Sequence, residues 1–212
     1  MEDRVATPPA TKQKADAIKP HRFDLVTIAG SAGGLKALQR ILHRLPADFP
    51  VPIAVVLHRT TREPNLLPEV LQRHTVLKVK LAEHAETMHP GTVYVAPPNL
   101  HMGVDSDLGV VLHDGRRIKH VLSSANPLFS TSAASLGGRV IGVVLTGYHS
   151  DGTDGVQSIH DQGGIVLAQD RASSEAFGMP ESAIATGCVD RVLPADEIAP
   201  ALQALTQYGR RA

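Results

Sequence analysis

Several residue types are scarce in this sequence, and each scarcity excludes a class of protein. Cys188 is the single cysteine, so no internal disulfide framework exists, and a reducing cytoplasm is the expected location. Its place just before an apolar strand favours a buried structural role. The 21 acidic residues balance the 21 Lys and Arg residues, which gives no electrostatic basis for a nucleic-acid partner or an anionic membrane. The apolar runs Val51–Leu57 and Val140–Leu145 are far too short for membrane insertion.

The composition changes at about residue 22. Residues 1–22 are polar, contain Pro8, Pro9 and Pro20, and have no apolar periodicity or signal-peptide core. We expect them to form a disordered N-terminal tail. Residues 23–212 carry regular apolar patterns, and their length suits one globular domain with a full-sized core.

Apolar runs alternate with amphipathic stretches through most of this second region. Continuous apolar runs favour buried parallel strands, and apolar stripes three to four residues apart favour helices. Strands are expected at Leu25–Ala29, Pro52–Leu57, Val140–Leu145, Ile165–Ala168 and Val189–Leu193, and helices at Leu35–Leu45, Leu66–Arg73, Asn126–Ala134, Val156–Asp161, Pro180–Ile184 and Glu197–Leu205. This alternation predicts an α/β fold with a doubly wound, mostly parallel, Rossmann-like sheet.

The stretch between Val76 and Ser123 has a different pattern. Short alternating strands at Leu77–Leu81, Val93–Ala96 and Gly109–Leu112 are separated by Gly, Pro and Asp turns. Such spacing is typical of antiparallel hairpins. We therefore expect a hairpin insertion at an edge of the sheet or over one end of it.

Three chemically complementary residues follow expected strands. Ser31 follows the first strand, His58 the second, and Asp151 lies shortly after the strand at Val140–Leu145. Ligands of open parallel sheets bind at this end of the strands. Ester hydrolysis by serine needs a hydroxyl, an imidazole that takes its proton and a carboxylate that orients the ring. The chain order Ser, His, Asp differs from those of α/β-hydrolases, chymotrypsin and subtilisin.

Each of these residues also has a purely structural explanation. A serine in a Gly-rich turn commonly caps a helix, although the turn around Ser31 is not a P-loop, because no Gly-Lys-Ser/Thr follows. A lone histidine such as His58 is often a hydrogen-bonded surface group. Asp154 and Asp170 compete with Asp151 for the carboxylate role, and spacing alone leaves that choice open.

Six segments together resemble the catalytic domain of the chemotaxis protein-glutamate methylesterase family. They occur in the family's order and span roughly Leu25 to Leu205: Val26–Gly34, Val55–His58, His89–His101, Leu145–Gly155, Gly163–Asp170 and Gly178–Pro180. The resemblance assigns residues 23–212 to a methylesterase-like catalytic domain, with a parallel doubly wound sheet and an antiparallel hairpin. It implies a catalytic triad of Ser31, His58 and Asp151, and needs neither a cofactor nor a metal.

The resemblance also implies a reaction and a partner. The expected reaction removes methyl esters from glutamyl residues on the cytoplasmic helices of methyl-accepting chemotaxis receptors, releasing methanol, with glutamine deamidation as a secondary activity. The family's full-length enzyme has an N-terminal receiver domain, whereas a short tail precedes the catalytic part here, so a stand-alone catalytic domain is expected. The alternatives are an esterase with a non-chemotactic substrate and a non-catalytic interaction module on the same fold.

The sequence departs from the family around the predicted cleft, formed by Ala32, Gly33, Tyr148 and His149. Ala32 replaces a common threonine, and Tyr148 and His149 replace a Met-Gly pair. By resemblance, the amide near Tyr148 helps to bind the oxyanion, together with amides around Ser31 at the helix N-terminus. His149 is interpreted as a second base, a metal ligand or a surface residue, with the last favoured because no paired ligand has metal-site spacing. The stretch Ser123–Phe129 is also altered, and it is expected near the active-site rim.

Overall fold

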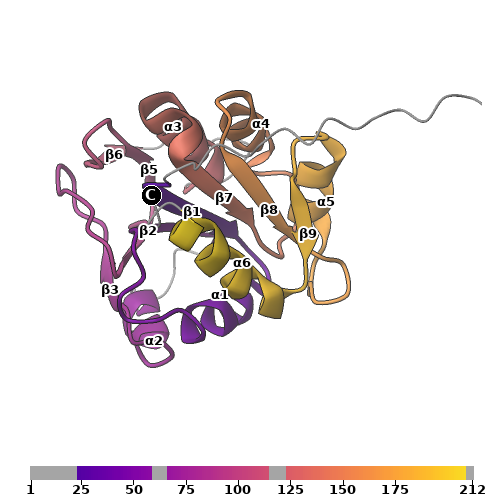
Figure 1. The fold of residues 1–212 in the computed structure, drawn as a ribbon, viewed down its shortest axis with the longest axis horizontal. Coiled ribbons are helices and arrows are strands. Elements are labelled where there is room, and N and C mark those ends of the chain that lie inside the picture. The colour runs from indigo at the N-terminus through magenta and orange to yellow at the C-terminus, as the bar shows by residue number, and fades with distance from the viewer. Residues whose placement is uncertain (1–22, 59–65, 115–122, 209–212) are drawn as a thin grey trace, which may run out of the picture.

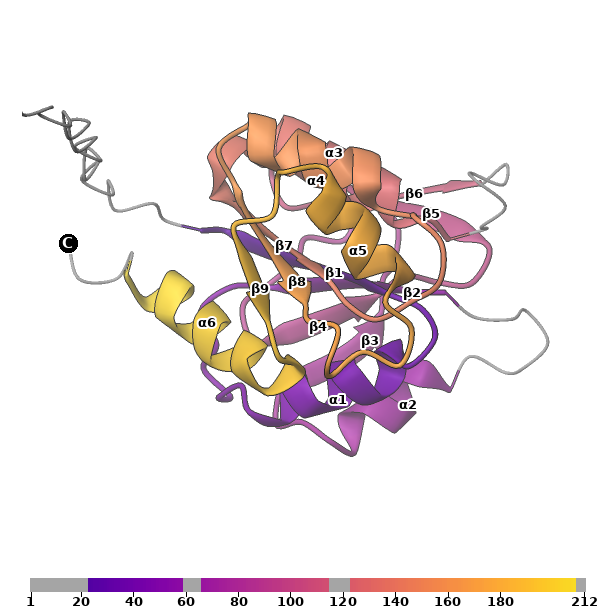
Figure 2. The same cartoon turned by 90° about the vertical axis from the view of Figure 1, so that its right-hand side faces the viewer.

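A seven-stranded sheet, parallel throughout, forms the centre of the structure, with the strand order β3-β4-β2-β1-β7-β8-β9 (Figures 1 and 2). This computed structural model describes residues 23–58, 66–114 and 123–208, so the tail expected at residues 1–22 lies outside the described residues. The strands are β1 (Leu25–Gly30), β2 (Ile53–Leu57), β3 (Lys78–Leu81), β4 (Thr92–Val95), β7 (Val140–Val144), β8 (Ile165–Gln169) and β9 (Arg191–Leu193). The predicted α/β class is confirmed.

Helices cover both faces of the sheet. They are α1 (Gly34–His43), α2 (Leu67–Gln72), α3 (Ala125–Leu136), α4 (Thr153–Asp161), α5 (Gly178–Ala185) and α6 (Ala195–Tyr208), and a 3-10 turn, η1 (Gly137–Arg139), follows α3. Figure 2 shows α1, α2 and α6 on one face and α3, α4 and α5 on the other. In the described ranges, no helix combines the length and hydropathy that crossing a bilayer requires.

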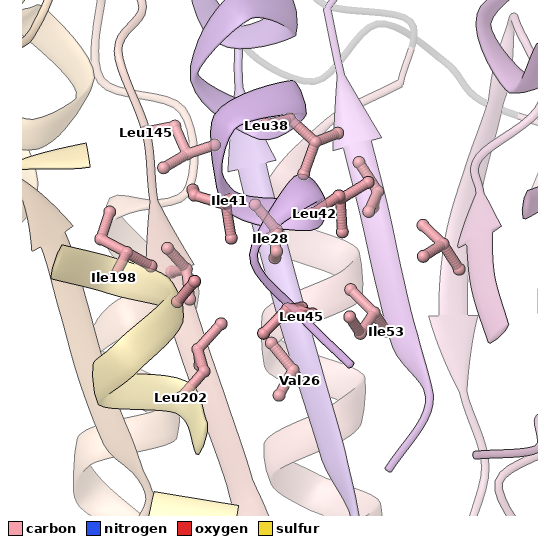
Figure 3. Close-up of a cluster of buried hydrophobic side chains, with 14 of the residues drawn as sticks. Val26, Ile28, Leu38, Ile41, Leu42, Leu45, Ile53, Leu145, Ile198 and Leu202 are labelled. Atoms are coloured by element: carbon pink, nitrogen blue, oxygen red, sulfur yellow. The ribbon is translucent and has the colours of Figure 1, made fainter. Parts of the chain in front are cut away.

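The central strand β1 is buried over its whole length, because it packs against helices on both faces. Val26 and Ile28 point into one core, where they meet Leu38, Ile41 and Leu202 (Figure 3). Leu25 and Ala29 belong to a second core on the opposite face, with side chains from α3, α4 and α5. This two-sided burial explains why the strand sequence is continuously apolar rather than alternating.

The hairpin prediction was right in kind and partly wrong in place. The predicted strands Leu77–Leu81 and Val93–Ala96 are β3 and β4, which pair parallel with each other at one edge of the main sheet. The half-exposed β3 edge produces an alternating pattern, and residues 82–91 between the two strands contain no helix, so the segment resembled a hairpin. The antiparallel hairpin consists of β5 (Leu100–Val104) and β6 (Val110–Asp114). Its first strand was not predicted, because Leu100–Val104 mixes apolar, histidine and glycine residues.

Candidate active site

Three neighbouring strands bring the predicted triad to one edge of the sheet. Ser31 follows β1, His58 follows β2 and Asp151 lies in the turn after β7, and β1 is flanked by β2 and β7. The His58 backbone N–H donates to the Gly30 carbonyl at 3.0 Å. His58 therefore lies beside the residue that precedes Ser31.

The His58 and Asp151 side chains are hydrogen-bonded to each other. His58 Nε2 lies 2.7 Å from Asp151 Oδ2, and the two side chains are 12% and 2% exposed. An ionised carboxylate only accepts hydrogen bonds, so this contact assigns the ring proton of neutral His58 to Nε2. Nδ1 is then the unprotonated nitrogen and the one able to act as a base.

Two further donors surround the Asp151 carboxylate. The Ser124 hydroxyl donates to Oδ1 at 2.5 Å, and the Ala125 backbone N–H donates to Oδ2 at 2.6 Å. Burial by itself raises the pKa of Asp151, but the hydrogen bonds from His58, Ala125 and Ser124 outweigh it and hold the pKa below its ordinary value. Asp151 is consequently ionised at neutral pH.

The structure also distinguishes the three candidate aspartates. Asp151 contacts His58, whereas Asp170 accepts hydrogen bonds from the Ser173 amide and hydroxyl at 2.9 and 2.6 Å. Asp154 lies in the first turn of α4 and faces the Asn126 side-chain amide at 3.4 Å. The geometry therefore favours Asp151 as the orienting carboxylate.

Ser31 begins a type II turn that leads into α1. The Gly34 N–H donates to the Ser31 carbonyl at 2.8 Å, and Gly33 has φ 76° and ψ −11°. Glycine is required at position 33, because a Cβ there would lie 2.7 Å from the Glu175 Cβ. Among the described residues, the Ser31 hydroxyl has no hydrogen bond to the His58 ring, although the two residues are neighbours. Catalytic hydrogen bonds often form only when the substrate is bound.

The backbone amides near Ser31 divide into engaged and available groups. The Ser31 N–H donates to the Thr146 carbonyl at 2.9 Å, and the Gly147 N–H donates to the Ala176 carbonyl at 2.8 Å. The expectation that amides around Ser31 bind the oxyanion therefore excludes the Ser31 amide itself. Within the described residues, the amides of Ala32, Gly33 and Tyr148 have no backbone acceptor, so they are available for an oxyanion.

A buried polar network holds the loop after β7 against the serine turn. The Thr146 N–H donates to Gln169 Oε1 at 2.9 Å, and the Thr146 hydroxyl lies 2.9 Å from the Ala32 carbonyl. Gln169 is fully buried and donates to the Ser173 carbonyl at 2.7 Å. Sequence reasoning missed Ser124, Thr146 and Gln169. The sequence signal that could have identified them was the presence of a polar residue at the end of an apolar strand, as at Thr146 and Gln169, or at the start of a helix, as at Ser124.

Tyr148 and His149 form the exposed part of this loop. Tyr148 is 62% exposed, and its ring meets that of His149 edge-on, with centroids 6.5 Å apart. His149 has φ 67°, a left-handed conformation that a residue with a side chain adopts only at a cost in energy.

Cys188 is buried, in agreement with the structural role predicted for it.

The fold and this site define a class: an α/β protein that carries a serine turn, a histidine and a buried carboxylate at one edge of a parallel sheet. Residues 26–202 match the family described as CheB methylesterase, and the chain belongs to this family. The solved catalytic domain of the Thermotoga maritima CheB methylesterase superposes with a TM-score of 0.83 at 35% identity, covering 86% of this chain and 98% of that one.

Curated relatives agree with this assignment. The protein-glutamate methylesterase FrzG of Myxococcus xanthus is 38% identical over 199 residues, which are 94% of this chain and 60% of that protein. A protein-glutamate methylesterase/protein-glutamine glutaminase of Anaeromyxobacter dehalogenans is 39% identical over 196 residues, 92% of this chain and 57% of the relative. The chain thus spans about three fifths of the length of these two relatives.

Proposed function

We propose that this chain is a serine esterase that removes methyl esters from glutamyl residues on the cytoplasmic helices of chemotaxis receptors. Ser31 is the nucleophile, His58 the general base and Asp151 the orienting carboxylate. The observation that carries the proposal is the 2.7 Å contact between His58 Nε2 and Asp151, located beside the turn that presents Ser31. A cytoplasmic location belongs to the same proposal.

The geometry supports the following sequence of steps. When substrate binds, the Ser31 side chain rotates so that its hydroxyl donates to His58 Nδ1. The Ser31 oxygen attacks the ester carbonyl as Nδ1 takes the proton, and the amides of Ala32, Gly33 and Tyr148 bind the oxyanion. His58 returns the proton to the departing methoxide, which leaves as methanol. Water, activated by His58, then cleaves the acyl-enzyme and yields the glutamate carboxylate.

The names of relatives support the choice of substrate. FrzG is named a protein-glutamate methylesterase, and the Anaeromyxobacter relative is named a glutaminase as well. We therefore include slow deamidation of receptor glutamines in the proposal. The exposed Tyr148 and strained His149 favour one alternative, an esterase of the same mechanism whose substrate is another methylated or acylated molecule.

Two assays test the proposal: methanol release from a methylated chemoreceptor fragment, and labelling of the protein by a fluorophosphonate. Ser31→Ala is expected to abolish both, while Ser158→Ala, on α4, retains both. Undiminished methanol release by Ser31→Ala would refute the assigned nucleophile. Labelling of Ser31 without receptor demethylation identifies the alternative substrate class. Folded wild-type protein that is not labelled indicates a non-catalytic module.

A further inference from the structure

Ser124 joins the N-terminus of α3 to the Asp151 carboxylate. Its side chain is the N-cap of α3, accepting a hydrogen bond from the Asn126 N–H at 3.2 Å, and its hydroxyl donates to Asp151 Oδ1 at 2.5 Å. Its backbone N–H donates to Nδ1 of the buried His101 at 3.1 Å. Ser124 is fully buried, so two contacts fix its hydroxyl, a third fixes its backbone, and solvent does not replace them.

These contacts determine the orientation of the carboxylate. Oδ2 receives the Ala125 N–H and His58 Nε2, whereas among the described residues Ser124 is the donor that the structure assigns to Oδ1. The terminal torsion of an aspartate is broad, so a carboxylate held at one oxygen turns easily. A donor on each oxygen fixes the plane of the carboxylate and, through Oδ2, the direction of the His58 ring.

We propose that Ser124 is a positioning residue of the active site, which holds the Asp151 carboxylate in the plane that directs His58 toward Ser31. This inference rests on the proposed function. It also changes the interpretation of the stretch Ser123–Phe129: Ser124 lies behind the triad, buried against its carboxylate, rather than at the rim of the cleft.

Ser124 has two roles, helix capping and carboxylate positioning, and the substitutions must separate them. Ser124→Ala removes both. Ser124→Gly removes the hydroxyl but retains most of the capping preference, since glycine at an N-cap costs only a few tenths of a kcal/mol relative to serine. Ser124→Thr keeps the hydroxyl. Ser132→Ala is the matched control, because Ser132 is a buried serine on the same helix whose hydroxyl has no partner in the described structure.

Two readouts are followed in each variant, with thermal unfolding as the check on folding: the rate of fluorophosphonate labelling, and kcat and KM for p-nitrophenyl acetate between about pH 3 and 9. We expect Ser124→Gly to lower kcat and the labelling rate on the order of 10- to 100-fold with KM unchanged, as for other misplaced catalytic groups. Loss of the Ser124 donor also raises the pKa of the Asp151 carboxylate, so the acidic limb of the profile, followed down to about pH 3, moves to higher pH. Ser124→Thr and Ser132→Ala keep the wild-type rates.

The outcomes separate this inference from the proposed function. A labelled wild type with unchanged kcat and pH profile in Ser124→Gly overturns the positioning role alone. A lowered melting temperature with unchanged rates in both Ser124→Ala and Ser124→Gly shows a helix cap and nothing more. Wild-type protein that is folded but neither labelled nor active overturns the proposed function, and the positioning role with it.

Discussion

Replacing Asp151 by asparagine is expected to remove the charge of the proposed triad carboxylate while preserving the histidine tautomer. The Ala125 backbone N–H donates to Oδ2 at 2.6 Å and cannot rotate away. An asparagine NH2 group at the Oδ2 position would face two other donors, the Ala125 N–H and His58 Nε2. The asparagine oxygen therefore takes the Oδ2 position, and the NH2 group faces the Ser124 oxygen. His58 then still donates from Nε2, and Nδ1 remains the base.

The magnitude of the loss follows from what is removed. In the Ser-His-Asp template, an asparagine that imposes the wrong tautomer lowers kcat about 10⁴-fold. Here the hydrogen bond to His58 changes from charge-assisted to neutral, a difference of about 1.5 kcal/mol or roughly tenfold. The lost attraction between carboxylate and imidazolium is at most about 4 kcal/mol at 4 Å and an effective dielectric constant of 20, or roughly 10³-fold. We expect a loss on the order of 10²-fold.

The assay measures kcat/KM for p-nitrophenyl acetate alongside ¹⁵N chemical shifts of the His58 ring. The control is Asp161→Asn, a substitution of an exposed carboxylate at the end of α4, which keeps full activity. A 10⁴-fold loss in Asp151→Asn, together with a spectrum that places the proton on Nδ1, would show that the fixed Ala125 amide does not determine the orientation of residue 151.

Two further outcomes are expected. His149→Gly relieves a left-handed conformation that costs about 1–2 kcal/mol, but it makes the unfolded chain freer, which costs about 0.5–1 kcal/mol. Chemical denaturation is therefore expected to give a free energy of unfolding about 0.5 kcal/mol higher than that of the wild type. His149→Ala retains the strain and gains no stability, so equal stability of the two variants contradicts this account. The depressed pKa of Asp151 contributes stability that is present above the unfolded-state value of about 3.9 and lost as pH falls through the lower folded value. The free energy of unfolding measured in urea should therefore fall more steeply below about pH 4 for the wild type than for Asp151→Asn. Equal pH dependence of the two free energies would exclude the effect.

The central strands and the helices that cover them were predictable from sequence, because a strand buried on both faces is apolar at successive positions, as in Leu25–Gly30. The edge strands were not. Lys78–Leu81 is half exposed on one side of the sheet, so its alternation matches that of a hairpin strand. Whether Lys78–Leu81 is a parallel edge strand or a hairpin strand depends on the strand with which it pairs. That pairing is a tertiary property, which the local sequence pattern does not determine.

The triad candidates were predictable for a different reason. Parallel strands end at one edge of the sheet, so Ser31, His58 and an aspartate after a later strand could be grouped from the sequence, and the family resemblance selected Asp151 among the aspartates. The residues behind them were not predictable. Ser124 precedes α3 as an ordinary helix cap would, and only the fold brings its hydroxyl to a carboxylate 27 residues further along the chain. Gln169 likewise reads as the polar end of a strand until its contact with Thr146 is known.

The placement of β7 beside β1 has a consequence for synthesis of the protein. Val140–Val144 pairs with a strand more than a hundred positions earlier, and Asp151 follows it. A nascent chain therefore exposes its serine and histidine long before the acidic partner leaves the ribosome. Contacts so distant in sequence form late in folding. Until β7 has emerged and the central sheet has closed, His58 lacks the carboxylate that contacts its ring, so under the proposed mechanism Ser31 is not yet activated.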